Sequence, residues 1–209
     1  MENASKALIM AGGVFVAILV ISLLVFFYNN IVTVQNADEQ AEIIAQATEF
    51  NKQYDVYNRN NLYGSEILSL ANKMENYNRR EAADKGYPEI EMEATLNEDV
   101  GEYFTRGTYS AQQLQSTLAN LQAKVEEYAN VSYCGRRISD LSTMRTNELE
   151  ELFRNNNSTG KLSEAQAVIT RYVTLKSEET EMRTKGFRCT QVEYDDQTGR
   201  VILMKFTST

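Results

Sequence analysis

The longest apolar run in the chain covers residues 7–28 and contains no charged side chain. Lys6 precedes it, and the next charged residue is Asp38. A helix of about 20 such residues crosses a hydrocarbon core of ~30 Å. A secretory signal peptide has a shorter apolar region of roughly 7–15 residues, followed by a small-x-small cleavage site. The run ends instead in Phe-Phe-Tyr. The pattern therefore predicts an uncleaved transmembrane anchor over residues 1–30.

The charges on either side of this run predict its orientation. Lys6 is the only basic residue before the run, and residues 29–51 contain neither Lys nor Arg. Basic residues favour the cytoplasmic side of a membrane, whereas acidic residues contribute little. We therefore expect a single-pass protein with its amino terminus inside and its carboxy-terminal domain outside the cytoplasm.

Beyond the anchor, apolar residues recur mostly at three- and four-residue steps, which is typical of amphipathic helices. They predict a connecting helix within residues 31–60, although the β-branched residues at 31–34 also allow an extended passage. Ser65 fits the N-cap of the next helix. The further predicted helices cover residues 65–85, 110–128, 137–153 and 163–186.

Strict alternation of apolar and polar residues at 89–94 predicts a half-buried strand. Residues 187–194 and 200–206 predict a hairpin, with Gly199 in its turn. The predicted fold class is α+β: an N-terminal transmembrane helix, then helices packed on a small antiparallel sheet with a C-terminal β-hairpin. Residues 61–209 would form the extracytoplasmic domain, with a helical insertion at 108–186.

Composition excludes several classes of function. The formal net charge is −8, which argues against nucleic acid as the main partner. The chain has no His, which excludes Ser-His-Asp catalysis and most zinc sites. No glycine-rich phosphate loop or Gly-x-Ser-x-Gly elbow occurs. We predict no catalytic residues, no cofactor and no metal site, and interpret the glutamates at 89, 91 and 93 as a solvated strand face.

The two cysteines, Cys134 and Cys189, both lie beyond the anchor. An external domain permits a disulfide, so we predict a bond between them. Two buried free thiols are the open alternative.

Small residues in the run stand four apart: Ala7 with Ala11, and Gly13 with Ala17. Such pairs allow membrane helices to approach closely, so these four residues are predicted to mediate helix self-association. Glu2 and Lys6 have the spacing of an i,i+4 ion pair.

Two resemblances follow from these features. An apolar N-terminal helix, an amphipathic helix and a sheet-bearing head with two cysteines resemble the layout of type IV pilins, although no prepilin leader or processing site precedes Glu2. The opening Glu-Asn-Ala-Ser-Lys-Ala-Leu resembles that of small single-span bacterial membrane proteins. The segments at 63–70 and 186–206 fit this second resemblance, which implies no activity.

The first hypothesis is a non-enzymatic single-pass membrane protein with a structural or assembly role, in a pilin-like filament or an envelope complex. Its partners would be the lipid bilayer and either itself or other envelope proteins. The alternatives are a membrane-tethered domain that binds a ligand or peptide, and an enzyme that depends on carboxylates.

Overall fold

The computed structural model describes the backbone of residues 2–209 and the side chains of residues 10–30 and 40–209. The chain divides into two compact units. The first unit contains Met1–Phe50 with Gln197–Gly199, and the second contains Asn51–Asp196 with Arg200–Thr209.

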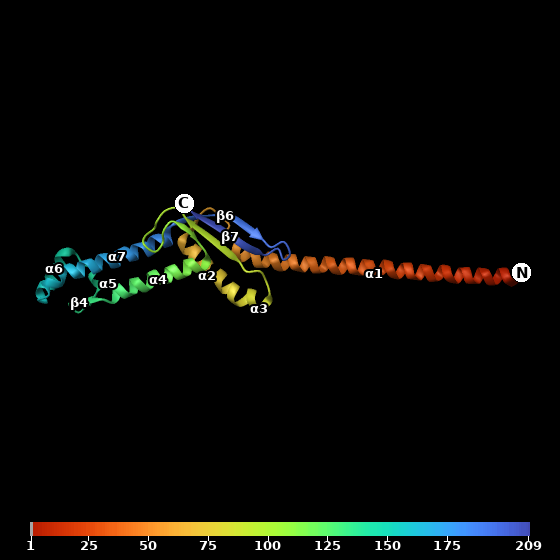
Figure 1. The fold of residues 1–209 in the computed structure, drawn as a ribbon, viewed down its shortest axis with the longest axis horizontal. Helices are drawn as coiled ribbons and strands as arrows, with labels where there is room; N and C mark the ends of the chain where they lie inside the picture. Colours follow the sequence, from red (N-terminus) through yellow and green to blue (C-terminus); the bar gives the residue numbers. More distant parts are fainter. Residues whose placement is uncertain (1) are drawn as a thin grey trace. The chain divides into compact units, whose positions relative to one another are not determined.

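A single helix, α1 (Glu2–Asp55), forms almost all of the first unit and is drawn in red to orange in Figure 1. It joins the predicted anchor and the predicted connecting helix without a break. The β-branched segment at 31–34 is helical and not extended, because helix propensity differs by less than about 1 kcal/mol between ordinary residues. The last turn of α1, from Asn51, belongs to the second unit.

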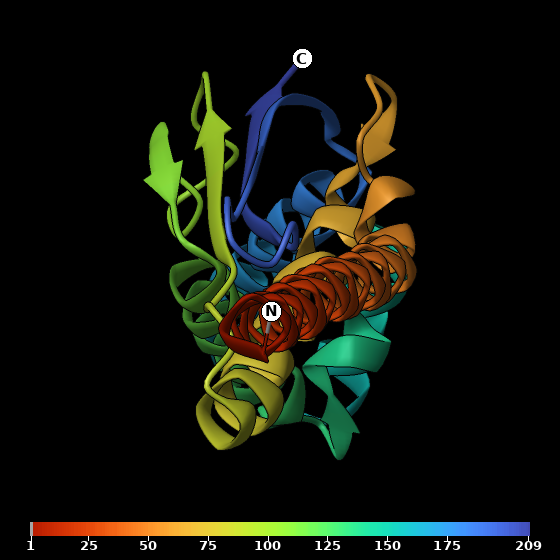
Figure 2. The same ribbon diagram turned by 90° about the vertical axis from the view of Figure 1, so that its right-hand side faces the viewer.

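The second unit is built on a mixed sheet, whose strands lie in the order β1-β6-β7-β2-β3. Figure 2 shows β1 at one edge and β3 at the other. The C-terminal hairpin is confirmed, because β6 and β7 pair antiparallel. The bounds of the strands are β1 Leu62–Tyr63, β2 Glu91–Leu96, β3 Gly107–Tyr109, β6 Gly186–Tyr194 and β7 Val201–Ser208.

The pairing of β2 with β7 is parallel, which corrects the prediction of a purely antiparallel sheet. Met92 lies beside Met204, and Ala94 lies beside Phe206. All four side chains are buried. A parallel pair needs a long crossover connection, which the helical insertion between the two strands supplies. This register therefore places one apolar face of the sheet against the helices.

Three longer helices complete this unit. α2 (Gly64–Tyr77) and α4 (Ala111–Asn130) pack on the sheet, and α7 (Leu162–Thr184) packs beside both of them (Figure 1). α2 continues through a π-helical turn (Asn78–Ala82) into α3 (Ala83–Lys85). The predicted N-cap at Ser65 is wrong. The cap is Tyr63, whose backbone N–H donates to the Glu66 carboxylate at 2.9 Å.

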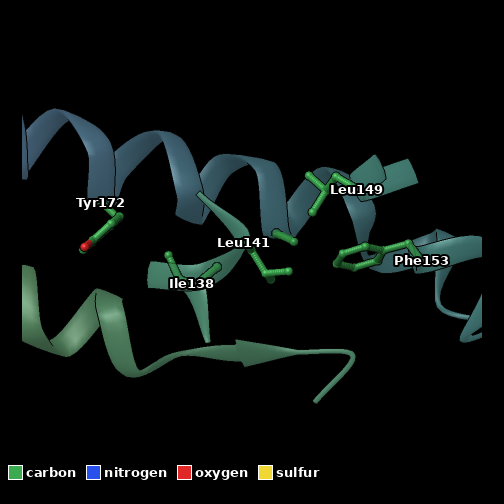
Figure 3. Packing of buried hydrophobic residues seen from close by; sticks show 6 residues of the cluster. Ile138, Leu141, Leu149, Phe153 and Tyr172 are labelled. Atoms are coloured by element: carbon green, nitrogen blue, oxygen red, sulfur yellow. The ribbon is translucent and has the colours of Figure 1, made fainter. Parts of the chain in front are cut away.

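A second apolar core lies at the end of the α4–α7 pair, where the side chains in Figure 3 converge. Ile138 and Phe153 are fully buried in it, and Tyr172 of α7 is nearly so. The predicted helix over 137–153 is interrupted at residues 142–145. The short elements here are β4 Ser132–Tyr133, β5 Arg136–Arg137, α5 Ile138–Leu141, α6 Thr146–Asn155 and the 3-10 turn Thr159–Lys161. Mixed helix and sheet with C-terminal strands confirm the predicted α+β class.

Candidate functional site: an apolar helix and a polar cavity

The most distinctive surface of the first unit is the apolar part of α1. Met10–Asn30 covers 21 residues with a mean hydropathy of 2.8, and none of its most apolar stretch is buried inside the chain. Exposure of its large apolar side chains ranges from 47% at Leu19 to 70% at Met10. Soluble proteins rarely expose so large a contiguous apolar surface. This helix is long and apolar enough to cross a membrane, as is expected of either an anchor or a signal sequence.

Two polar side chains of this segment, those of Ser22 and Asn30, form hydrogen bonds within the helix. Ser22 donates its hydroxyl to the Ile18 carbonyl at 2.8 Å. The Asn30 amide donates to the Phe26 carbonyl at 3.0 Å. Hydrocarbon offers no hydrogen-bond partners, so a spanning segment must satisfy its own polar groups. The local bonding of α1 therefore suits a hydrocarbon environment.

The small residues of the predicted contact lie on two sides of α1. The side chains of Ala7, Glu2 and Lys6 lie outside the described residues. Ala11, Gly13 and Ala17 are exposed. At about 100° per residue, Gly13 and Ala17 share one face, whereas Ala11 lies roughly 160° from Gly13. A Cβ added at Gly13 would meet no described atom within 4 Å outside the local helix. The Gly13–Ala17 face is thus open, and Ala11 belongs to a different face.

A polar cavity of about 430 Å³ lies within the second unit, between the end of α1 and α2. Most side chains of its wall come from one face of α2 and the π-helical turn, at three- and four-residue steps. They include amides, a hydroxyl and charged groups, namely Gln53, Tyr54, Ser69, Asn72, Lys73, Asn76, Tyr77, Arg80 and Glu81. This stripe of polar positions in α2 was the sequence signal for the cavity, which the sequence analysis missed.

Lys73 joins the two walls of this cavity. Its ammonium donates to the Gln53 carbonyl at 2.9 Å, close to the carboxy end of α1. It also lies 4.9 Å from the ring centre of Tyr54, within the range of a cation–π contact. Burial lowers the pKa of Lys73 and raises the pKa of Tyr54, because the charged form of each loses hydration. The main role that these contacts support is to hold the last turn of α1, within the second unit, against α2.

The π-helical turn at the cavity rim is fixed by Asn78. Its side-chain amide donates to the Ile90 carbonyl at 2.9 Å, and its side-chain oxygen accepts from the Ile90 N–H at 2.8 Å. Single π-helical turns occur frequently at functional sites. Here the turn carries Arg80 and Glu81 to the rim, so this cavity is the candidate ligand site of the second unit.

A buried carboxylate organises the loop between β2 and β3. Glu178 of α7 is 4% exposed and accepts three backbone N–H groups, from Glu102 at 3.0 Å, Tyr103 at 2.6 Å and Phe104 at 2.9 Å. A Cβ at Gly101 would lie 2.2 Å from the Glu178 carboxyl carbon, so any larger residue there would displace the carboxylate from this position. All of its observed partners are backbone groups, which indicates a structural role.

The predicted disulfide is not formed, because both cysteines are free thiols. Cys134 occupies the turn between β4 and β5, beside the second core, with a φ of 51°. Cys189 lies in β6 of the main sheet, where its backbone N–H donates to the Arg59 carbonyl at 2.9 Å. The two cysteines belong to different packing layers, a separation that sequence spacing did not reveal. Burial raises the pKa of the Cys189 thiol.

Among the described residues, no group of three or more Asp, Glu or Cys side chains is arranged to hold a metal ion. Several of the described acidic side chains form ion pairs at the surface, such as Glu102 with Arg171 at 2.5 Å and Glu93 with Lys205 at 2.9 Å. Comparison of the chain with protein-family models, with curated proteins and with solved structures finds no match.

Proposed function

We propose that the chain is a non-enzymatic, single-pass membrane protein whose domain at 61–209 lies outside the cytoplasm and which assembles with itself or with other envelope proteins. The observation that carries this proposal is the exposed apolar helix at Met10–Asn30. At 1.5 Å per residue it is about 32 Å long, which matches a hydrocarbon core of ~30 Å. A pilin-like filament subunit is the narrower form of the same proposal.

The distribution of basic residues supports the orientation. Lys6 lies just before the span, and the next basic residue is Lys52. Basic residues near a span favour the cytoplasmic side. A membrane-impermeant maleimide applied to intact cells should therefore label Cys134 of the full-length protein. Labelling only after the membrane is broken would indicate the opposite orientation, with the domain inside the cytoplasm.

The open Gly13–Ala17 face supports assembly. In lipid, apolar side chains gain nothing by leaving the bilayer, so helices associate through close packing at small residues. Gly13 has space for a partner helix, because no described atom outside the local helix approaches its Cβ position within 4 Å. A second copy of the same helix would fill this space.

Two matched substitutions test assembly through this face. Gly13→Leu and Gly12→Leu each add the same side chain to the span, but at positions about 100° apart around the helix. We expect both variants to insert, and only Gly13→Leu to lose chemical cross-linking between copies in membranes. Equal cross-linking of the two variants would remove this face from the interface. A wild-type protein that does not cross-link would contradict assembly.

The cavity beside Lys73 favours a second candidate function, a membrane-tethered ligand-binding domain. Its amides and cations can hydrogen-bond to carboxylates or sugar hydroxyls. Binding to the folded state raises its stability. Sodium acetate or N-acetylglucosamine should then raise the melting temperature of the full chain in detergent, and Asn76→Ala should abolish that rise. Asn60→Ala, at an exposed residue elsewhere, is the control. No rise with either probe would count against this function.

A further inference from the structure

The part of α1 that follows the candidate span, residues 31–50, is named the stalk here. It is helical throughout and about 30 Å long at 1.5 Å per residue. Its charged residues are all acidic: Asp38, Glu39, Glu42 and Glu49. Side-chain pairs between neighbouring turns support a helix, and in the stalk the Gln46 amide donates to the Glu42 carboxylate at 3.1 Å. Such a pair contributes only a few tenths of a kcal/mol, and most of the stability of a protein helix comes from packing of one face.

One side of the stalk already has a packing partner within the first unit. Ala47 is 5% exposed, and a Cβ at Gly199 would lie 3.5 Å from the Ala47 methyl group. On another side, the described residues Ala41, Ile44 and Thr48 are exposed. Ile44 is 65% exposed, although isoleucine is among the most frequently buried residues in proteins. This second side is therefore open to a partner from outside the chain.

The uncovered side has the spacing of a coiled-coil seam. Ala41, Ile44 and Thr48 lie on it at steps of three and four, and Val34 and Ala37 continue the same series of steps in the sequence. These steps are those of the a and d positions of a heptad. The stripe is centred roughly 100° from Ala47 around the helix, so the contact with Gly199 does not cover it.

We propose that this stripe is the seam of a parallel, in-register coiled coil between two copies of this chain. The inference rests on the proposed membrane assembly, because two copies inserted in the same direction run parallel and at the same height. Parallel coiled coils place apolar residues at a and d. Ile44 then occupies a d position between Ala41 and Thr48 at a.

The acidic residues are placed so that two copies do not repel each other along this seam. With Ala41 at a, Glu42 and Glu49 fall at b, and Glu39 falls at f. These positions point away from the partner helix. Asp38, at e, is the only acidic residue of the stalk that flanks the seam. The g position at Gln40 faces the partner's Ala45 at e, so no like-charge pair forms there.

The same series of steps leads back into the membrane span. From Val34, alternating steps of three and four reach residues 31, 27, 24, 20, 17 and 13. Gly13 and Ala17 therefore lie on the continuation of the seam. The two consecutive steps of three, at 31–34–37, are a stammer, which overwinds a coiled coil locally. One interface accounts for both the small residues in the span and the exposed isoleucine of the stalk.

A cysteine scan of the stalk tests the seam in the full-length protein in membranes. The background carries Cys134→Ser and Cys189→Ser, so that each variant has one thiol. On oxidation, we expect disulfide-linked dimers for Ala41→Cys, Ile44→Cys and Thr48→Cys. Cross-linking should be severalfold weaker for Glu42→Cys and Gln46→Cys, which lie off the seam. Uniform cross-linking, or a maximum at residue 42 or 46, would overturn the proposal.

A pair of charge substitutions provides an independent readout. Ile44→Lys and Gln46→Lys add the same side chain to one helix, at positions about 160° apart. Only Ile44→Lys should reduce cross-linking at Thr48→Cys severalfold; an equal effect of the two would overturn the seam. If stalk cross-links fail while the wild-type anchor still cross-links, the seam is wrong and membrane assembly stands. If neither cross-links, both proposals fall.

Discussion

The two units of the chain use apolar residues in opposite ways. In the second unit, large apolar side chains such as Phe104, Phe153 and Leu114 are fully buried. In the first unit, Phe26 and Phe27 are 62% and 57% exposed. The other large apolar side chains along Met10–Asn30 are exposed as well. Burial of apolar area is the dominant favourable term in folding in water. The second unit thus buries its apolar side chains within its own fold, whereas the apolar helix at Met10–Asn30 exposes them and is long enough to cross a membrane.

The sharpest test of this contrast makes the same type of substitution, Phe to Ala, once in each unit. Phe153→Ala should destabilise the second unit by about 3–5 kcal/mol, because it leaves a cavity in the second core. Phe27→Ala should leave the unfolding of that unit unchanged. Urea unfolding of the full chain in detergent measures both. Similar losses would mean that the span is part of the same packed core.

A charge placed in each unit tests the contrast from the other side. Leu19→Arg puts a cation near the middle of the span, where insertion costs about 2.5–3.5 kcal/mol. We expect a smaller share of this variant than of the wild type in the membrane fraction. Val173→Arg, at a site that is 47% exposed in α7, should change stability by less than about 0.5 kcal/mol. Full membrane retention of Leu19→Arg would count against a spanning helix.

The second unit also buries a charged group, the carboxylate of Glu178. A buried carboxylate is stable only when hydrogen bonds replace its lost hydration. Glu178→Gln keeps one acceptor oxygen and places an NH₂ group against backbone donors. We expect a loss of about 1.5–3 kcal/mol in the free energy of unfolding. Glu181→Gln, at an exposed position one turn further along α7, is the control and should be near neutral. A neutral Glu178→Gln would show that the loop does not depend on the carboxylate.

The smallest expected effect concerns Tyr54, near the carboxy end of α1. Its side chain is 1% exposed, in contrast to the exposed apolar residues of the same helix at Met10–Asn30. Burial raises the pKa of Tyr54, so the folded state holds its phenol proton more tightly than the unfolded chain does. The resulting stability is full below about pH 10 and is lost as the pH rises further. Tyr54→Phe should therefore reduce the loss of stability in alkaline solution. Identical alkaline profiles would assign that loss to other groups.

Local patterns were enough to predict most elements of the fold. The apolar run, the helices α2, α4 and α7 and the C-terminal hairpin follow from periodicity and turn residues. The parallel register of β2 on β7 could not be predicted. Met92 and Met204 are far apart in the sequence, and an alternating strand does not specify its partner or its direction.

The candidate sites were less predictable than the elements. A helical wheel alone separates Ala11 from Gly13, so the two faces of the span were accessible to sequence reasoning. The bonds from Glu178 to the loop at 102–104 were not, because they join residues more than 70 positions apart and involve backbone donors that have no sequence signature. The separation of the two cysteines could not be predicted either, because it depends on how segments distant in the sequence pack together.

The central claim is that the exposed helix at Met10–Asn30 stays in the mature protein and crosses a membrane. One measurement tests it directly: extraction of membranes with alkaline carbonate, followed by N-terminal sequencing of the recovered chain. We expect the protein in the pellet, with the segment Met10–Asn30 still part of the recovered chain. Recovery in the supernatant, or a sequence that begins near residue 30, would contradict the claim and identify the helix as a signal sequence.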